Sequence, residues 1–209
     1  MAIVPFTRHD FQVFDLPGFA ERMDAIRGAI RPKLEGLGAA LTPALAAIVE
    51  QELFPHVARH ARRTVNPPDD TWVAIGPDRR GYKKARHFKV AVSRHTLRFL
   101  FEVGPEYAAK PEWTRAWKRG APGLARSLGS VPGLGWFRSE HDEAPAIALA
   151  DLDAGGWRRL GDEVTRTRDG QLVLGRRVDA TDAARWRAPD YERAALETFT
   201  ALRDCFRLH

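Results

Sequence analysis

The spacing of apolar residues changes several times along the chain, and each spacing predicts one kind of element. Phe19, Met23, Ile26 and Ile30 recur at three- and four-residue steps, which predicts an amphipathic helix that Pro32 ends or kinks. A second helix is expected from Thr42 to Leu53, because threonine followed by proline is typical of a helix start. Residues 55–64 are predicted to form a third helical piece, which the prolines at 67 and 68 stop.

The middle of the chain carries the alternating pattern of β-strands. Residues 71–75 are rich in strand formers, and in residues 87–92 and 96–103 apolar side chains alternate with other residues. A turn-rich loop, residues 76–81, joins the first two strands, and a tight turn near residues 93–95 joins the second pair. This order predicts an antiparallel meander with one apolar face.

The C-terminal half has a weaker pattern, with helices expected over 113–128, 151–164 and 191–208 and a strand over 171–178. Cys205 falls beside the apolar stripe of the last helix, which indicates a core thiol. The predicted fold class is therefore α+β: N-terminal helices packed on an antiparallel β-meander, with further helices and a strand in the C-terminal half. We expect one domain, residues 1–209, because no repeat or long linker divides the chain.

Composition limits the class of protein. The 209 residues are 44% hydrophobic, enough for a substantial core, and a single cysteine rules out an internal disulfide framework. The longest uncharged run, residues 36–49, is interrupted by Pro43 and is shorter than the roughly 20 residues of a membrane-spanning helix. The first residues lack the layout of a signal peptide. We therefore expect a cytoplasmic protein with no membrane partner.

Positive charge is concentrated in one part of the chain. The formal net charge is +6, from 33 Lys and Arg against 27 Asp and Glu. Eleven of these basic residues and only three acidic ones lie between Phe54 and Arg98, together with four of the seven histidines. A local excess of this kind is typical of an anionic partner, although a solvated surface in an arginine-rich protein is the alternative.

The histidines of this basic block fall on two predicted polar surfaces. On the expected helix over 55–64, His56 and His60 share a face with Arg59 and Arg63, opposite the apolar stripe. On the strands, His87 and Lys89 project to the same side as Arg98 and Glu102. Pairing of Lys89 or Arg98 with Glu102 explains three of these charges, and His87 is left without an evident local partner.

Residues 80–84, Arg-Gly-Tyr-Lys-Lys, follow in the loop between the first two strands. Glycine lets a ligand approach the backbone, tyrosine can stack on a ring, and the cations Arg80, Lys83 and Lys84 can contact phosphate. A hairpin tip with solvated lysines is the alternative for this short segment.

Several of these segments together resemble the YktB-like family of uncharacterised bacterial proteins. The resemblance rests on residues 54–68, 71–74, 80–84 and 87–88, and it covers roughly residues 10–110. It implies an α+β fold and no established activity. It also implies that the histidines, the arginine pair Arg62 and Arg63, Asn66, Trp72 and the 80–84 segment belong to one site.

The first functional hypothesis is a module that binds an anionic, phosphate-containing ligand, RNA or a nucleotide, without a cofactor. Trp72 is the candidate stacking residue, and a core position is its structural alternative. The candidate anion-binding residues are Arg59, Arg62, Arg63, Asn66, Arg80, Tyr82, Lys83 and Lys84.

Three alternatives stay open. A metal-independent enzyme acting on phosphoesters would use His56 and His60 as acid and base, with His87 as a third candidate. A metal protein would use the i, i+4 spacing of His56 and His60, although Arg59 and Arg63 would repel a dication. A protein partner with an acidic surface is the third alternative.

Overall fold

The fold is described here from a computed structural model, which describes residues 2–61 and 63–208. One seven-stranded sheet runs through it in the order β1-β2-β3-β4-β7-β5-β6, and every neighbouring pair is antiparallel. The strands are β1 Phe54–Val57, β2 Asp70–Gly76, β3 His87–Ser93, β4 Thr96–Val103, β5 Gly135–Phe137, β6 Ile147–Ala148 and β7 Leu172–Asp179. The α-helices are α1 Arg8–Gln12, α2 Phe19–Ala25, α3 Arg31–Val49, α4 Lys110–Leu128, α5 Ala154–Thr165, α6 Ala180–Ala183, α7 Ala188–Ala201 and α8 Arg203–Arg207.

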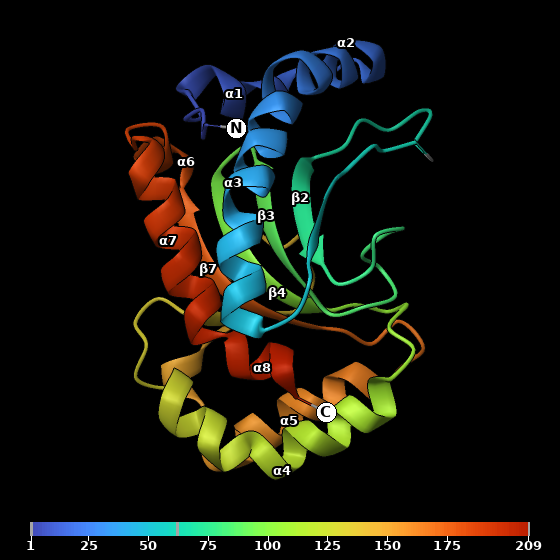
Figure 1. The fold of residues 1–209 in the computed structure, drawn as a ribbon. Helices are drawn as coiled ribbons and strands as arrows, with labels where there is room; N and C mark the ends of the chain where they lie inside the picture. The colour runs from blue at the N-terminus through green and yellow to red at the C-terminus, as the bar shows by residue number, and fades with distance from the viewer. Residues whose placement is uncertain (1, 62, 209) are drawn as a thin grey trace.

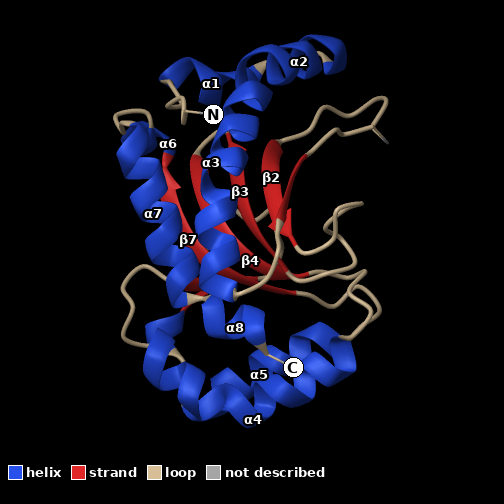
Figure 2. Cartoon of the chain, viewed as in Figure 1, coloured by secondary structure: helices blue, strands red, loops and turns tan. Residues whose placement is uncertain are grey.

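Helices α3 and α7 cover one face of the sheet, and α4 and α5 lie side by side at one end of the molecule (Figures 1 and 2). The covered face carries the apolar residues of the alternating strands, such as Phe88, Val90 and Phe99, all fully buried. Phe88 packs against Phe199 of α7 and Phe206 of α8 with ring centroids 4.7 and 4.9 Å apart. These observations confirm the predicted α+β class with N-terminal helices on an antiparallel meander.

The C-terminal elements match the predictions in kind. The helices expected over 113–128 and 151–164 are α4 and α5, and the strand expected over 171–178 is β7, which inserts between β4 and β5. The last predicted helix is interrupted at Leu202 into α7 and α8. Cys205 is buried as predicted, and burial raises the pKa of its thiol.

Of the two outcomes predicted for Pro32, an end of the first helix is not what the structure shows. The chain stays helical from Phe19 to Val49 because a π-helical turn, Ile26–Ile30, links α2 to α3. A proline ring clashes with the carbonyl four residues earlier in a regular α-helix, and the wider π turn just before Pro32 accommodates it. Pro43, expected to start a second helix, lies inside α3.

The predicted third helix over 55–64 is also wrong, because residues 54–57 form the edge strand β1. Its register with β2 pairs His56 with Ala74 and Val57 with Val73. Pro55 has no backbone N–H and is tolerated at a sheet edge. The backbone then leaves the sheet, and His60 takes a positive φ of 49°. Val57, Ala58 and Ala61 belonged to the apolar stripe of the predicted helix, and their helical spacing does not correspond to a helix in the structure.

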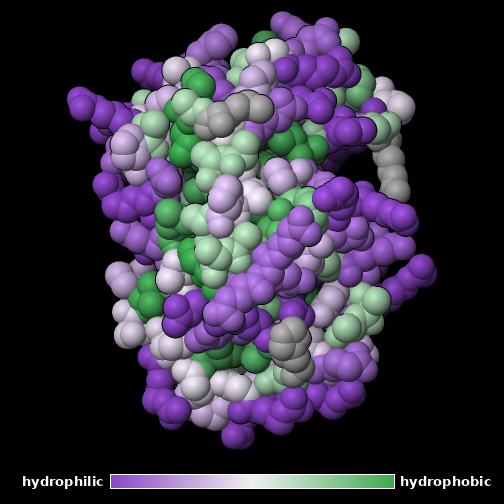
Figure 3. All heavy atoms as spheres, in the orientation of Figure 1, coloured by the Kyte–Doolittle hydropathy of each residue, from purple (hydrophilic) through white to green (hydrophobic). Residues whose placement is uncertain are grey.

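No helix in the described part of the chain is long and apolar enough to cross a membrane. In the view of Figure 3, apolar residues surface in the middle, along α3 and α7, and hydrophilic residues dominate the periphery. The large apolar side chains that stand exposed among the described residues are Val4 and Val65.

Helix α3 approaches the sheet closely at Gly38, which yields a stability prediction. A Cβ built on Gly38 would lie 2.8 Å from a methyl of buried Val73 and 3.1 Å from Cβ of Pro55. Gly38→Ala should therefore lower the free energy of unfolding by about 1 to 3 kcal/mol through overpacking. Gly28→Ala is the matched control, because nothing lies within 4 Å of its Cβ position. It should raise stability by about 0.5 to 1 kcal/mol through helix propensity. Urea unfolding compares the two, and equal effects would contradict the close approach.

Candidate functional site

Charged side chains line the face of the sheet that points away from α3. Strand alternation and register place Asp70 and Trp72 of β2, His87 and Lys89 of β3, and Arg98 and Glu102 of β4 on this face. The sequence predicted this shared side for the residues of β3 and β4. The structure adds that the face is buried: Lys89 and Arg98 are 0% exposed.

Glu102 holds two partners on neighbouring strand β3. Its carboxylate lies 3.1 Å from Nε2 of His87 and 3.1 Å from Nζ of Lys89, which also contacts Glu140. The expectation that His87 lacks a local partner is therefore wrong. Arg98 pairs instead with Asp70 at 2.7 Å.

The neighbouring charges keep these buried groups ionised. Burial alone would raise the pKa of Glu102, but the charges of Lys89 and His87 outweigh it and lower that pKa. Burial would also lower the pKa of Lys89, and Glu102 and Glu140 raise it instead. For Asp70 the effect of burial is overcome by the hydrogen bond from His141 and the charge of Arg98, so its pKa falls to about 2.

A loop between β5 and β6, residues 138–146, closes over this face. Arg98 Nη1 donates to the backbone oxygens of Glu140 (3.0 Å) and Asp142 (2.8 Å). Ser93 donates to Glu143 at 2.6 Å, and His141 Nδ1 lies 3.1 Å from Asp70. Asp70, Glu140 and His141 were not among the predicted site residues, because about 70 residues separate the loop from β2 and no local spacing links them.

Beside this face lies a cleft of about 1030 Å³. It is large enough for a drug-sized or nucleotide-sized ligand. Six of the predicted site residues line it: His56, Arg59, Arg80, Tyr82, Lys83 and Lys84. Helix α3 contributes Arg31, Glu35 and Ala39, which the sequence analysis did not include.

Tyr82 joins the cleft to the buried face. Trp72 Nε1 donates a hydrogen bond to the Tyr82 hydroxyl at 3.0 Å, and the Tyr82 ring lies 4.8 Å from the His87 ring, edge on. Burial raises the pKa of Tyr82. Lys89 Nζ lies over the Trp72 ring, 4.2 Å from its centroid, in a cation–π contact. Trp72 is thus half-buried among polar groups, between core and surface.

The other predicted site residues lie elsewhere. His60 contacts Trp72 edge on at 5.4 Å, and its Nε2 is 3.0 Å from the Thr71 hydroxyl oxygen. Arg63 and Asn66 are exposed on the loop between β1 and β2. Arg62 lies outside the described residues, and His87 is buried below Tyr82.

His56 and His60 do not share a helix face, because no helix forms there. His56 lies in β1 with Nε2 2.9 Å from the backbone oxygen of Asp78, whereas His60 lies at Trp72. The helical spacing behind the zinc hypothesis is therefore absent. Within residues 2–61 and 63–208, no three His, Cys, Asp or Glu side chains are grouped to hold a metal ion.

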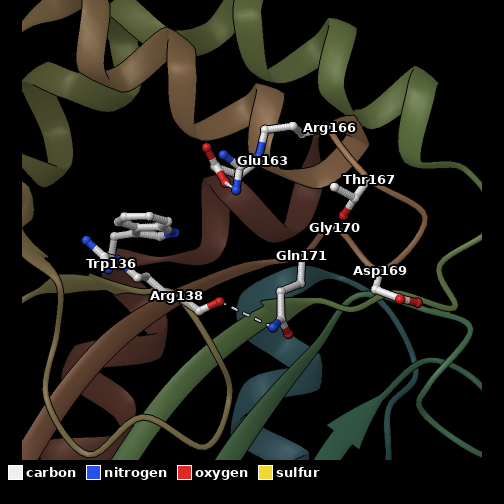
Figure 4. Close-up of a pocket in the computed structure, with 8 residues that line it drawn as sticks. All are labelled: Trp136, Arg138, Glu163, Arg166, Thr167, Asp169, Gly170 and Gln171. Carbon is white, nitrogen blue, oxygen red and sulfur yellow. Dashed lines mark hydrogen bonds and ion pairs between the residues drawn. The ribbon is translucent and has the colours of Figure 1, made fainter.

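A smaller cavity of about 410 Å³ lies between the end of α5 and β5 (Figure 4). Arg166 pairs with Glu163 at 2.9 Å, and Gln171 donates to the backbone oxygen of Arg138 at 3.3 Å. With Asp169, its described lining carries two positive and two negative side chains. This balance gives the cavity no preference for an anion, whereas the described lining of the larger cleft carries five basic side chains and three acidic ones, Glu35, Asp78 and Glu106.

Comparison with known proteins places the chain among uncharacterised sequences. Residues 6–206 match the family described as Domain of unknown function (DUF1054). A UPF0637 protein of Bacillus licheniformis is 32% identical over 84% of this chain and 82% of the relative. One from Oceanobacillus iheyensis is 30% identical over 97% and 95%, and one from Shouchella clausii is 48% identical over 49% and 51%. The similarity thus extends well beyond residues 10–110, to which the sequence analysis had confined the family resemblance.

Removing one partner from the buried ion pairs should be costly. Glu102→Gln leaves His87 and Lys89 beside a neutral group, so we expect the free energy of unfolding to fall by about 3 to 5 kcal/mol. Glu112→Gln breaks an exposed pair with Arg115 and should cost less than about 1 kcal/mol. Chemical denaturation measures both, and a loss below about 1 kcal/mol for Glu102→Gln would mean that its charge is not needed.

The low pKa of Asp70 predicts a pH dependence of stability. Its pKa is about 2 in the folded protein against 3.8 ordinarily, so the stabilisation is fully present above about pH 4. It is lost as the pH falls towards 2. The stability difference between wild type and Asp70→Asn should therefore shrink by about 2 kcal/mol over that range. Urea titrations at several pH values test this, and a constant difference would contradict it.

Proposed function

The chain belongs to the DUF1054 family, whose description names no activity, and from its geometry we propose that the cleft binds an anionic, phosphate-containing ligand, an RNA or a nucleotide. The single observation that carries the proposal is the excess of basic side chains among the described residues that line this cleft, five basic against three acidic. They come from α3, the end of β1 and the loop between β2 and β3, which lie far apart in sequence.

Most of these cations are available to a ligand. Arg59, Arg80 and Lys84 are exposed and make no ion pair with any described residue. Lys83 has a loose contact with Glu106 at 3.7 Å, and both side chains are half exposed. Exposed pairs of this kind contribute little, so an anionic ligand can replace Glu106 at small cost. The cations can therefore contact phosphates along the cleft.

Tyr82 supplies an aromatic group beside these cations. Its hydroxyl is fixed by Trp72, and its ring lies 6.1 Å from the ring of His56, which also lines the cleft. Because the Tyr82 hydroxyl is fixed by this hydrogen bond, the ring loses little conformational freedom when a base stacks on it. Trp72 donates to the Tyr82 hydroxyl and so orients the Tyr82 ring.

The proposal is tested by removing two unpaired cations. Arg80→Ala with Lys84→Ala should weaken binding of a single-stranded RNA oligomer and of a nucleoside triphosphate. For RNA, the slope of log affinity against log salt should become shallower by about 0.7 for each cation removed. Fluorescence anisotropy at several salt concentrations measures both quantities.

Arg126→Ala with Arg158→Ala is the matched control, because it removes the same charge from exposed positions on α4 and α5. It should leave the affinity and the salt slope close to those of the wild type. If neither probe binds the wild type, or if both double variants weaken binding equally, the cleft is not the binding site.

A further inference from the structure

Asp70 and His141 form a hydrogen-bonded acid and imidazole pair that the proposed cleft does not use. His141 Nδ1 lies 3.1 Å from both Asp70 oxygens, and Asp70 is held from the other side by Arg98 at 2.7 Å. Asp70 stays ionised, with a pKa of about 2, so it can only accept, and Nδ1 of His141 carries the proton. Nε2, which lies 3.9 Å from Oε1 of Glu140, is then the nitrogen that can face a substrate, on a side chain that is 48% exposed.

The backbone on both sides of His141 is fixed. Arg98 Nη1 binds the carbonyl oxygens of Glu140 and Asp142, the residues directly before and after it. Arg98 itself is 0% exposed and cannot move without opening the sheet face. His141 is therefore presented at the surface by a rigid support, as a proton-transferring group requires.

His60 is a second histidine that packs near Trp72, as His141 does. Its ring lies 5.4 Å from that of Trp72, and the ring of His141 lies 5.9 Å from the same indole. Nε2 of His60 is 3.0 Å from Thr71 Oγ1, which leaves Nδ1 available. The positive φ of His60 is disfavoured for residues with a side chain, and such backbone strain is concentrated at functional positions.

The cleft leads to these two histidines. Arg59 and Tyr82 both line the cleft. Arg59 is the residue before His60, and Tyr82 accepts a hydrogen bond from Trp72. A ligand bound at Arg59 is therefore one residue away from His60 along the chain. The hydroxyl that His60 contacts, Thr71, is 1% exposed, so the attacking group must come from the substrate.

We propose that His60 and His141, gathered at Trp72, form an acid and base pair that cleaves the phosphodiester bonds of RNA bound in the basic cleft. The inference rests on the proposed function and names its substrate. RNA fits because its 2′-hydroxyl is an internal nucleophile next to each phosphorus, and proton transfer is the remaining requirement.

The step balances without a further reactant. Nδ1 of neutral His60 takes the proton of the 2′-hydroxyl while its oxygen forms a bond to the adjacent phosphorus. The bond from phosphorus to the 5′ oxygen breaks, and Nε2 of protonated His141 gives its proton to that leaving oxygen. The products are a 2′,3′-cyclic phosphate and a free 5′-hydroxyl, and water returns the two histidines to their starting protonation states.

The surroundings of the two histidines suit these opposite roles. Burial lowers the pKa of His60 to about 4; Arg63, His141 and Lys89 act in the same direction, and Asp70 opposes them. The hydrogen bond that His141 donates to Asp70 raises the pKa of His141, as do the charges of Asp70 and Glu140, while burial and Lys89 oppose it. A neutral base and a protonated acid can then coexist near neutral pH.

The test uses a short single-stranded RNA with a fluorophore and a quencher, and the same oligomer with 2′-O-methyl groups. Wild type should cleave the first and bind but not cleave the second, because the nucleophile is blocked. His60→Gln and His141→Gln should each lower kcat by about a hundredfold or more. His95→Gln, an exposed histidine in the turn between β3 and β4, is the matched control and should cleave like wild type.

The pH profile identifies the positioning role of Asp70. The wild-type rate should rise above about pH 4 and fall again above the raised pKa of His141. Asp70→Asn should move the upper limb to lower pH. His141→Gln should remove that limb, and it keeps the test decisive if Asp70→Asn does not fold.

The outcomes separate the two proposals. RNA that binds but is cleaved no faster by wild type than by His141→Gln overturns the acid and base pair and leaves the binding function standing. RNA that neither binds nor is cleaved overturns both. Cleavage of the 2′-O-methyl oligomer would contradict the internal nucleophile.

Discussion

The rest of the structure depends on the burial of opposite charges on one face of the central sheet. Lys89 and Arg98 are completely buried, and their partners Asp70, Glu102 and Glu140 come from two strands and a distant loop. A buried charge without its partner costs several kcal/mol, so these groups must meet in one arrangement. Apolar packing alone would let loops slide over the face, whereas charge pairing fixes which loop covers which strand.

This constraint determines where functional groups can appear. The loop 138–146 is held through Lys89 and Arg98, and it delivers His141 to Asp70. On the other side, Lys89 lies over Trp72, and Trp72 anchors Tyr82 at the edge of the basic cleft. The buried charges therefore connect a structural role in the sheet with the placement of His141 and Tyr82.

Much of the fold could be predicted from the sequence because its signals are local. Strand formers predicted β2, and alternation predicted β3, β4 and the side on which His87, Lys89, Arg98 and Glu102 lie. Residues 55–64 were wrongly predicted to be helical. The strand that forms there is four residues long, too short for its pattern to distinguish a two-residue period from a helical one, and its pairing with β2 determines that it is a strand. Asp70 and His141 could not be found at all, since only folding brings them together.

Lys89 and Arg98 hold the loop that carries His141. Amide hydrogen exchange in Lys89→Met tests it most directly, because methionine preserves the packing and removes the charge. Amide exchange should become faster at Asp142 and Ala146, whose amides donate to the backbone oxygens of Ser139 and Trp136, while protection in β3 and β4 should stay unchanged. Equal protection of this loop in wild type and variant would contradict it.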